Sequence, residues 1–276
     1  MTHDHRPSSG NDVPFNKSSR VLIALPDHDF DTTEVAIPWQ YLTAHGVEVT
    51  FCTEHGAVGQ TDPLLLRGVL FGRLGARLFG LGAGDAAVAA YHQLEQDTSF
   101  CHPLRYAEIV PTDYAALILP GGHAKGMRQY LESSLLQEKV LDFWQRGILI
   151  GAICHGTIVL ARTMNPATQQ SVLYGRRLTG LTKSLEQAGF YVSVWRRGRY
   201  YRTYPAYVED EVVAAIGPDG RFEHGNSRNQ PFVVEDGHLI TARWPGDALA
   251  FAQKIEQRLL ATPGDGKSVV AEREQL

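Results

Sequence analysis

The chain has 276 residues, 43% of them hydrophobic and 20% charged, so it is long enough to bury a sizeable α/β core. Its formal net charge of −4 excludes the strongly basic character that is typical of nucleic-acid-binding proteins. Cys52, Cys101 and Cys154 lie far apart, which argues against a disulfide framework and indicates a reducing, cytoplasmic compartment. No apolar run is long enough to span a membrane, and the polar N-terminus does not have the pattern of a signal peptide.

In chain order, residues 1–19 are polar and are expected to form a disordered leader. An apolar run at 21–25 predicts a strand that is covered on both faces. A helix is expected from 34 to 45, and a second strand from 47 to 52. This strand–helix–strand order predicts a parallel sheet. Residues 56–112 are rich in glycine, and we interpret them as an insertion that packs over the sheet edge.

Later segments continue the α/β alternation. The insertion is expected to contain a helix near 85–96, and weaker strands are predicted at 191–195, 211–216, 231–235 and 238–242. The clearest elements are a strand at 115–119, a helix at 132–145, a strand at 148–153, and helices at 157–163 and 247–260. We therefore expect one α/β domain at 20–261, followed by a loose tail at 262–276.

Within residues 148–157 a buried strand, a cysteine and the start of a helix follow one another. Cys154 stands at the expected N-terminus of the helix, where the helix dipole lowers the pKa of a thiol. Gly151 and Gly156 allow a sharp turn that leaves backbone N–H groups free to hold an oxyanion. Cysteine is also a common small core residue. The glycine-flanked turn and the adjacent His155 favour a nucleophile.

A second loop, at 119–123, follows the neighbouring strand and leaves the same carboxyl edge of the sheet. Open parallel sheets place their ligand crevice at this edge. Gly121 and Gly122 allow a backbone conformation that aims N–H groups into the crevice, where Gly122 can complete an oxyanion hole with the amide of His155. His123 either lines the pocket or caps the following helix.

Glu34 follows the first strand and begins the first helix, so it faces the same edge of the sheet. A carboxyl group in this position can hydrogen-bond the Cys154 sulfur and tune its protonation. The position is also that of an ordinary first-turn acid that complements the helix dipole.

Three motifs together resemble the ThiJ/PfpI (DJ-one) superfamily of the class I glutamine-amidotransferase-like fold: Glu34-Val35-Ala36-Ile37-Pro38, Leu119-Pro120-Gly121-Gly122-His123 and Ala152-Ile153-Cys154-His155-Gly156. The resemblance covers about residues 20–55 and 114–255. It implies a flavodoxin-like three-layer α/β/α sandwich with a mostly parallel sheet, interrupted by the segment at about 56–112. The Cys-His-Gly sequence resembles the branch that contains PfpI-type proteases and a bacterial heat-shock chaperone with glyoxalase activity.

The resemblance also implies roles for individual residues: Cys154 as nucleophile, Glu34 as its carboxyl partner, His155 as base, and Gly122 with His155 as backbone oxyanion donors. From their position in the loop after the neighbouring strand, we also expect Gly121 to bind the oxyanion and His123 to line the substrate pocket. One feature departs from the family pattern. The family supplies a His, or an Asp that partners the histidine, on a loop after the nucleophile, and residues 178–186 contain neither. Glu186 is the only acid there, and it is either that partner or an ordinary helix residue.

Arginines and tyrosines alternate between residues 196 and 204. We interpret this run as a solvated surface, with an anionic ligand or partner as the alternative.

The function that these residues predict is a cysteine-dependent reaction on a small carbonyl or amide substrate, either glyoxalase-like hydration or C–N hydrolysis. We expect no metal and no organic cofactor, no nucleic-acid or membrane partner, and a homodimer as in the superfamily. Two alternatives remain: a hydratase or lyase dedicated to one pathway metabolite, and a redox-sensing or chaperone-type stress protein in which Cys154 is oxidised.

Overall fold

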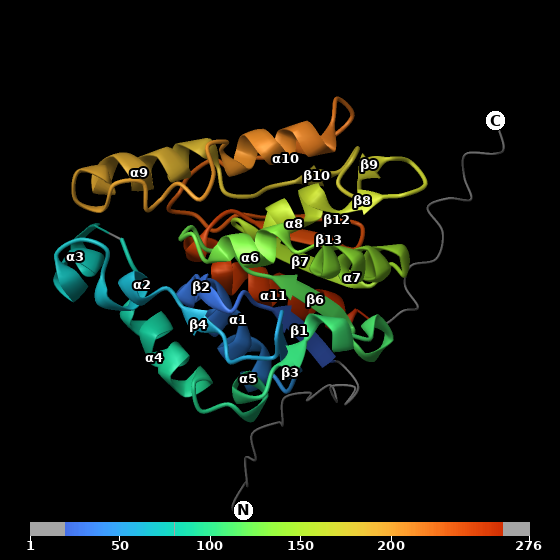
Figure 1. The fold of residues 1–276 in the computed structure, drawn as a ribbon, viewed down its shortest axis with the longest axis horizontal. Coiled ribbons are helices and arrows are strands. Elements are labelled where there is room, and N and C mark those ends of the chain that lie inside the picture. Colours follow the sequence, from blue (N-terminus) through green and yellow to red (C-terminus); the bar gives the residue numbers. More distant parts are fainter. Residues whose placement is uncertain (1–19, 80, 262–276) are drawn as a thin grey trace, which may run out of the picture.

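The computed structural model describes residues 20–79 and 81–261, so the expected leader at 1–19 and tail at 262–276 lie outside the described residues. A seven-stranded sheet runs through the centre of the molecule (Figure 1). All its neighbouring strands are parallel except the first pair. The order in space is β12 (Val233–Asp236), β13 (Leu239–Ala242), β7 (Leu149–Ile153), β6 (Ala116–Leu119), β1 (Arg20–Ala24), β3 (Glu48–Thr53) and β5 (Leu104–Arg105).

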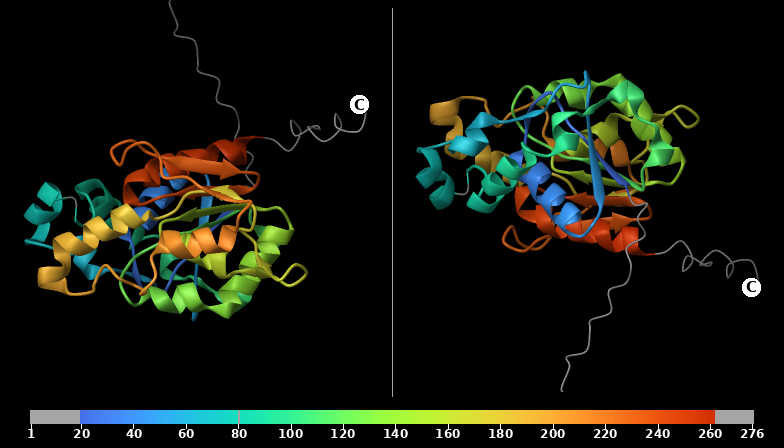
Figure 2. Two further views of the ribbon diagram at one scale, coloured as in Figure 1. Left: turned by 90° about the horizontal axis from the view of Figure 1, so that it is seen from above. Right: turned by 90° about the horizontal axis from the view of Figure 1, so that it is seen from below.

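Helices cover both faces of this sheet and give the molecule three layers (Figure 2). One face is covered by α1 (Thr32–Ala44) and α11 (Ala248–Leu260), with α4 (Asp85–Leu94) packed against α1. The other face is covered by α7 (Ser134–Gln145) and α8 (Gly156–Arg162), with α6 (Met127–Glu132) and α10 (Val208–Ile216) packed against α8. The predicted α/β/α sandwich with a mostly parallel sheet is therefore confirmed.

The strands at the centre of the sheet are apolar along their length because both of their faces are covered. Every residue of β6 and β7 is buried, and β1 is buried from its second residue onward. Helix α1 begins where Asp31 accepts hydrogen bonds from the backbone N–H groups of Thr33 (2.8 Å) and Glu34 (3.1 Å). This cap sets the position of Glu34 in the first turn, above the carboxyl ends of the strands.

The insertion at 56–112 contains more regular structure than the sequence predicted. Its expected helix is α4, and β5 extends the sheet edge by pairing with β3. It also contains α2 (Pro63–Arg67), α3 (Gly72–Phe79) and α5 (Thr98–Cys101). Short strand pairs outside the main sheet are β2 (His28–Phe30) with β4 (Gln60–Thr61), β8 (Met164–Asn165) with β9 (Gln170–Ser171), and β10 (Arg177–Leu178) with β11 (Arg221–Phe222).

Two of the weaker strand predictions are wrong. Residues 191–195 belong to α9 (Lys183–Arg197), which begins at a Thr182 side-chain cap. Residues 211–216 belong to α10, whose buried residues Val208, Val212 and Ile216 recur at helical spacing. The predicted hairpin around Asp236-Gly237 is confirmed as the antiparallel pair β12–β13. None of the described helices combines the length and the apolar character needed to cross a membrane.

A buried ion pair fixes the loop that precedes β12. Arg243 and Asp247 have side chains that are 2% and 1% exposed, and the Arg243 Nε–H donates to Asp247 Oδ2 over 2.8 Å. The same guanidinium donates to the backbone carbonyls of His224, Ser227 and Gln230. This arginine therefore ties the loop at 224–230 to the start of α11.

Replacing Asp247 by alanine is expected to lower the free energy of unfolding by about 3–5 kcal/mol, because the variant leaves the Arg243 cation buried without its partner. Urea unfolding at neutral pH measures this change. The control is Asp142→Ala, which removes the exposed Arg146–Asp142 pair and is expected to cost about 0.5 kcal/mol or less. Equal losses in the two variants would show that the Arg243 pair is not a stabilising contact.

Candidate active site

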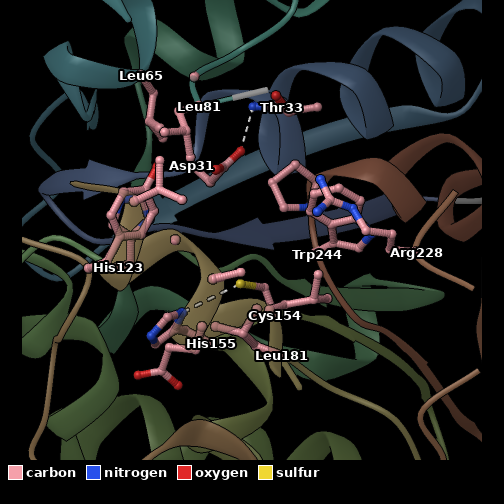
Figure 3. A pocket seen from close by; sticks show the side chains of 18 residues that line it. Asp31, Thr33, Leu65, Leu81, His123, Cys154, His155, Leu181, Arg228 and Trp244 are labelled. Atoms are coloured by element: carbon pink, nitrogen blue, oxygen red, sulfur yellow. Dashed lines mark hydrogen bonds between the residues drawn. The ribbon is translucent and has the colours of Figure 1, made fainter. Parts of the chain in front are cut away.

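Cys154 lies on a strained elbow between β7 and α8. Its backbone φ is +57°, in the left-handed region that non-glycine residues occupy at a cost of about 1 kcal/mol or more. The elbow lies directly against the end of β6, because a Cβ at Gly156 would collide with the carbonyl oxygen of Leu119. The Cys154 side chain is 6% exposed and lines a cavity (Figure 3).

The loop after β6 brings Glu34 and Cys154 together. The Gly121 N–H donates to Glu34 Oε2 over 2.8 Å. A Cβ on Gly121 would come within 2.8 Å of both Glu34 Oε2 and the Cys154 Cβ, so only glycine fits there. This corrects one prediction, since the Gly121 amide is occupied by Glu34 and is not free to bind an oxyanion. Gly122 has a φ of +155° and lies beside it.

Burial opposes the lowering of the Cys154 pKa that is expected at a helix N-terminus. Burial raises the pKa of Cys154 well above its ordinary value, and the charges of Glu34 and Asp31 raise it further. The backbone N–H of His155, which hydrogen-bonds the sulfur, opposes this only in part. Burial likewise raises the pKa of Glu34, and the neighbouring Asp31 adds to the effect. Because both groups are buried next to each other, loss of the proton from one of them makes loss of the proton from the other less favourable.

His155 is held between Cys154 and Thr203, a residue that was not among the predicted site residues. Its Nδ1 lies 3.4 Å from the Cys154 Sγ, and its Nε2 lies 3.2 Å from the Thr203 Oγ1. The Thr203 hydroxyl donates its single proton to the carbonyl of His123 over 2.6 Å. It can therefore only accept from His155, which places the ring proton on Nε2 and leaves the Nδ1 lone pair facing the thiol.

Both histidines of the site are neutral. Burial, followed by the nearby Arg202 charge, lowers the pKa of His155 to about 3. Burial also lowers the pKa of His123 to about 3. The His123 ring stacks on Tyr201 with a centroid distance of 4.0 Å. His123 lines the cavity, which is one of the two roles that were expected for it.

Glu186 does not occupy the position of the missing histidine partner. Both ring nitrogens of His155 have other partners, and Glu186 instead pairs with Arg202 (3.5 Å) and accepts from the Val208 N–H (3.1 Å). Burial raises the pKa of Glu186 to about 7. The carboxyl lines the cavity, so it contributes to the wall without contacting the base.

The segment that supplies Thr203 was interpreted as a solvated surface, and this is wrong for its buried members. Arg202 and Thr203 are buried, whereas Arg196 and Arg199 are exposed. Thr203 follows the nucleophile by almost fifty positions, beyond the loop where the family pattern places a partner, and no motif marks it. Only the packing of the chain after α9 against the 119–123 loop reveals it.

The cavity around the sulfur has a volume of about 240 Å³. Its lining comes from the start of α1, the insertion, the loop after β6, the elbow, α9 with its flanking residues, the loop before β12 and the segment before α11: Asp31, Thr33, Leu65, Leu81, Gly82, His123, Cys154, His155, Leu181, Leu185, Glu186, Ala188, Gly189, Val192, Tyr201, Arg228, Trp244 and Pro245. Within residues 20–79 and 81–261, no group of three or more His, Cys, Asp and Glu side chains is placed to hold a metal ion.

The fold and the site together define an α/β protein with a buried cysteine on a strand–helix elbow, flanked by a carboxyl group and a neutral histidine. Residues 25–225 match the family described as ThiJ/PfpI family-like, and the chain belongs to that family.

Several relatives are similar over most of the chain. Glyoxalase 3 of Candida albicans is 21% identical over 222 residues, covering 80% of this chain and 86% of the relative. The glutathione-independent glyoxalase hsp3102 of Schizosaccharomyces pombe is 24% identical over 226 residues, covering 80% and 85%. Protein dj-1beta of Drosophila melanogaster is 29% identical over 181 residues, covering 65% and 72%.

Solved structures show the same fold. The crystal structure of glyoxalase III from Candida albicans has a TM-score of 0.61 at 18% identity and covers 87% of this chain and 97% of its own. Rapid Encystment Protein 24 KDa of Francisella tularensis has a TM-score of 0.65 at 21% identity and covers 87% and 99%.

Replacing Thr203 by valine is expected to slow alkylation of Cys154 by iodoacetamide at pH 7 by about tenfold or more. Valine removes the acceptor of the Nε2 proton, so the Nδ1 lone pair is no longer held toward the thiol. Mass spectrometry follows the labelling in a background with Cys52→Ser and Cys101→Ser. Thr203→Ser keeps the hydroxyl and should restore the rate; equal slowing in both variants would contradict the tautomer assignment.

Replacing Glu34 by glutamine is expected to lower the pKa of Cys154. In the native protein, the negative charge of Glu34 disfavours loss of the proton from Cys154 and so raises the pKa of the thiol. Glutamine has a neutral amide in place of the carboxylate, so this repulsion is removed. The midpoint of the alkylation rate against pH should shift down by about one unit or more. The same profile for Glu95→Gln, an exposed acid of the insertion, should be unchanged. A midpoint that stays in place or rises would contradict the prediction.

Proposed function

We propose that this chain is a glutathione-independent glyoxalase that converts a 2-oxoaldehyde and water into a 2-hydroxy acid, with Cys154 as nucleophile. The observation that carries the proposal is the position of the thiol between Glu34 and the Nδ1 of His155 within a cavity. Two relatives that cover most of the chain bear glyoxalase names, which favours this reaction over C–N hydrolysis.

In the first step the Cys154 sulfur adds to the aldehyde carbon. A carbon–sulfur bond forms, the carbonyl π bond opens, and the thiol proton passes to the neutral Nδ1 of His155. The raised pKa of the thiol means that this proton leaves as the bond forms, and not beforehand. The backbone N–H of Gly122 stabilises the oxygen on which negative charge develops. The His155 N–H, which hydrogen-bonds the sulfur in the resting site, joins it once the sulfur is bonded to carbon. Return of the proton to that oxygen gives a hemithioacetal.

In the second step a proton leaves the former aldehyde carbon and another is returned to the adjacent carbonyl carbon. An enediol lies between the two proton transfers, and their product is a thioester of the 2-hydroxy acid. Glu34 is suited to carry this proton because its raised pKa allows the carboxyl both to accept and to return it. Water then attacks the thioester, the carbon–sulfur bond breaks, and the thiol regains its proton.

The redox-sensing alternative receives less support from the geometry. Oxidation by peroxide proceeds through an accessible thiolate. Cys154 is 6% exposed and burial raises its pKa, so both conditions are disfavoured in the resting protein.

Replacing Cys154 by serine is expected to reduce the conversion of methylglyoxal to lactate by about a thousandfold or more, because the nucleophile is lost. Lactate is measured chromatographically without added glutathione, and circular dichroism confirms that the variant is folded. Cys101→Ser, in the insertion, is the matched control and should retain full activity. Equal lactate formation by the Cys154→Ser variant and the unmodified chain would rule out the proposed mechanism.

A further inference from the structure

The wall of the cavity beyond the sulfur is mostly apolar. Its apolar side chains come from three separate parts of the chain: Leu65 and Leu81 from the insertion, Leu181, Leu185 and Val192 from α9 and the loop before it, and Trp244 before α11. Figure 3 shows Leu65 and Leu81 at the end of the cavity away from Cys154. A substrate whose aldehyde carbon reaches the sulfur must therefore place its other end among hydrocarbon side chains.

The acids that line the cavity are already engaged. The Oδ1 of Asp31 accepts from the backbone N–H groups of Thr33 and Glu34, and Glu186 is paired with Arg202 and accepts from the Val208 N–H. The buried, unpartnered polar side-chain atoms among the lining residues are the Nε2 of His123 and the indole Nε1 of Trp244. Elsewhere along this wall an apolar substituent would be stabilised by burial, whereas a polar one would lose its hydration.

Arg228 is the cation at the rim of the cavity. It is exposed, and its guanidinium lies 5.6 Å from the centre of the Trp244 ring. Its charge therefore remains in solvent while its side chain covers the apolar wall.

The size of the cavity and the two rings in its lining favour a substituent larger than a methyl group. In Figure 3 the rings of His123 and Trp244 lie on opposite sides of the cavity, with Cys154 between them. His123 is fixed by stacking on Tyr201 with an interplanar angle of 8°. The volume of about 240 Å³ is several times the space of about 30 Å³ that one water takes in the liquid, and a triose-sized aldehyde leaves much of it unfilled.

From these observations we infer that the site prefers 2-oxoaldehydes that carry an aryl or branched apolar substituent over methylglyoxal. This inference rests on the proposed glyoxalase function. The aldehyde carbon lies at the sulfur, and the substituent lies between the His123 and Trp244 rings and against Leu185.

The first test compares initial rates of mandelate formation from phenylglyoxal and of lactate formation from methylglyoxal. The value of kcat/KM is expected to be at least about tenfold higher for phenylglyoxal, because additional apolar contacts in a pocket give discrimination of this size. A value for methylglyoxal that equals or exceeds that for phenylglyoxal overturns the inference and leaves the proposed function intact.

Substitutions in the cavity wall test whether the substrate preference arises from the cavity. Leu185→Gln places an amide in the apolar wall and should lower the ratio of the two kcat/KM values by about tenfold. Leu81→Gln makes the same change from the insertion, so the test does not depend on one variant folding. The matched control is Leu249→Gln, an exposed position on α11 outside the cavity lining, and it should leave the ratio unchanged. If the ratio of the two kcat/KM values is unchanged in both wall variants, the inference is overturned.

A binding measurement separates this inference from the proposed function. In the Cys52→Ser, Cys101→Ser background, mandelate should protect Cys154 from iodoacetamide at a concentration at least about tenfold lower than lactate does. If neither aldehyde is converted but mandelate protects better, the proposed reaction fails and the preference of the cavity is upheld. If methylglyoxal is converted and lactate protects as well as mandelate, the reaction is upheld and the preference is overturned.

Discussion

The backbone at Cys154 turns in a left-handed conformation directly against the loop after β6, and the remaining parts of the site take their positions from this contact. Parallel pairing of Leu119 with Ala152 brings the ends of β6 and β7 to the same edge of the sheet. Gly156 permits the elbow to touch the Leu119 carbonyl, and Gly121 permits the loop to lie between the elbow and Glu34. A side chain at either glycine would separate the thiol from its carboxyl partner.

The same close packing determines the protonation states of the ionisable groups in the site. Burial raises the pKa values of Cys154 and Glu34 and lowers that of His155, so each group is driven toward its neutral form. The resting site therefore does not depend on a preformed thiolate. Its chemistry depends on short proton transfers between groups whose orientations are fixed, above all the Nδ1 of His155, which Thr203 holds toward the sulfur.

The part of the site that could be predicted from the sequence is the part formed by local geometry at strand ends. Cys154 and the glycine loop follow strands of the main sheet directly, and Glu34 lies in the first turn of the helix that comes after β1, so their common position at the carboxyl edge of the sheet could be predicted. Thr203 could not be found in this way, because it reaches His155 through a contact between distant segments. Helix α9 was missed because its alternating valines and aromatic residues at 191–195 imitate a strand, although the Thr182 cap begins a helix.

The segments that the family motifs do not cover also determine what can enter the cavity. Leu65, Val69 and Leu70 of the insertion form a small apolar cluster against Tyr200 and Tyr201. Hydrogen bonds from Arg197 to the Val69 carbonyl (2.7 Å) and from the Tyr200 hydroxyl to Asp62 hold the insertion to the end of α9 and the chain that follows it. The reacting groups belong to the short motifs at the sheet edge, whereas the opposite wall is formed by the insertion and α9. A substitution in that wall can therefore change which substrate fits while the elbow, the carboxyl group and the base keep their geometry.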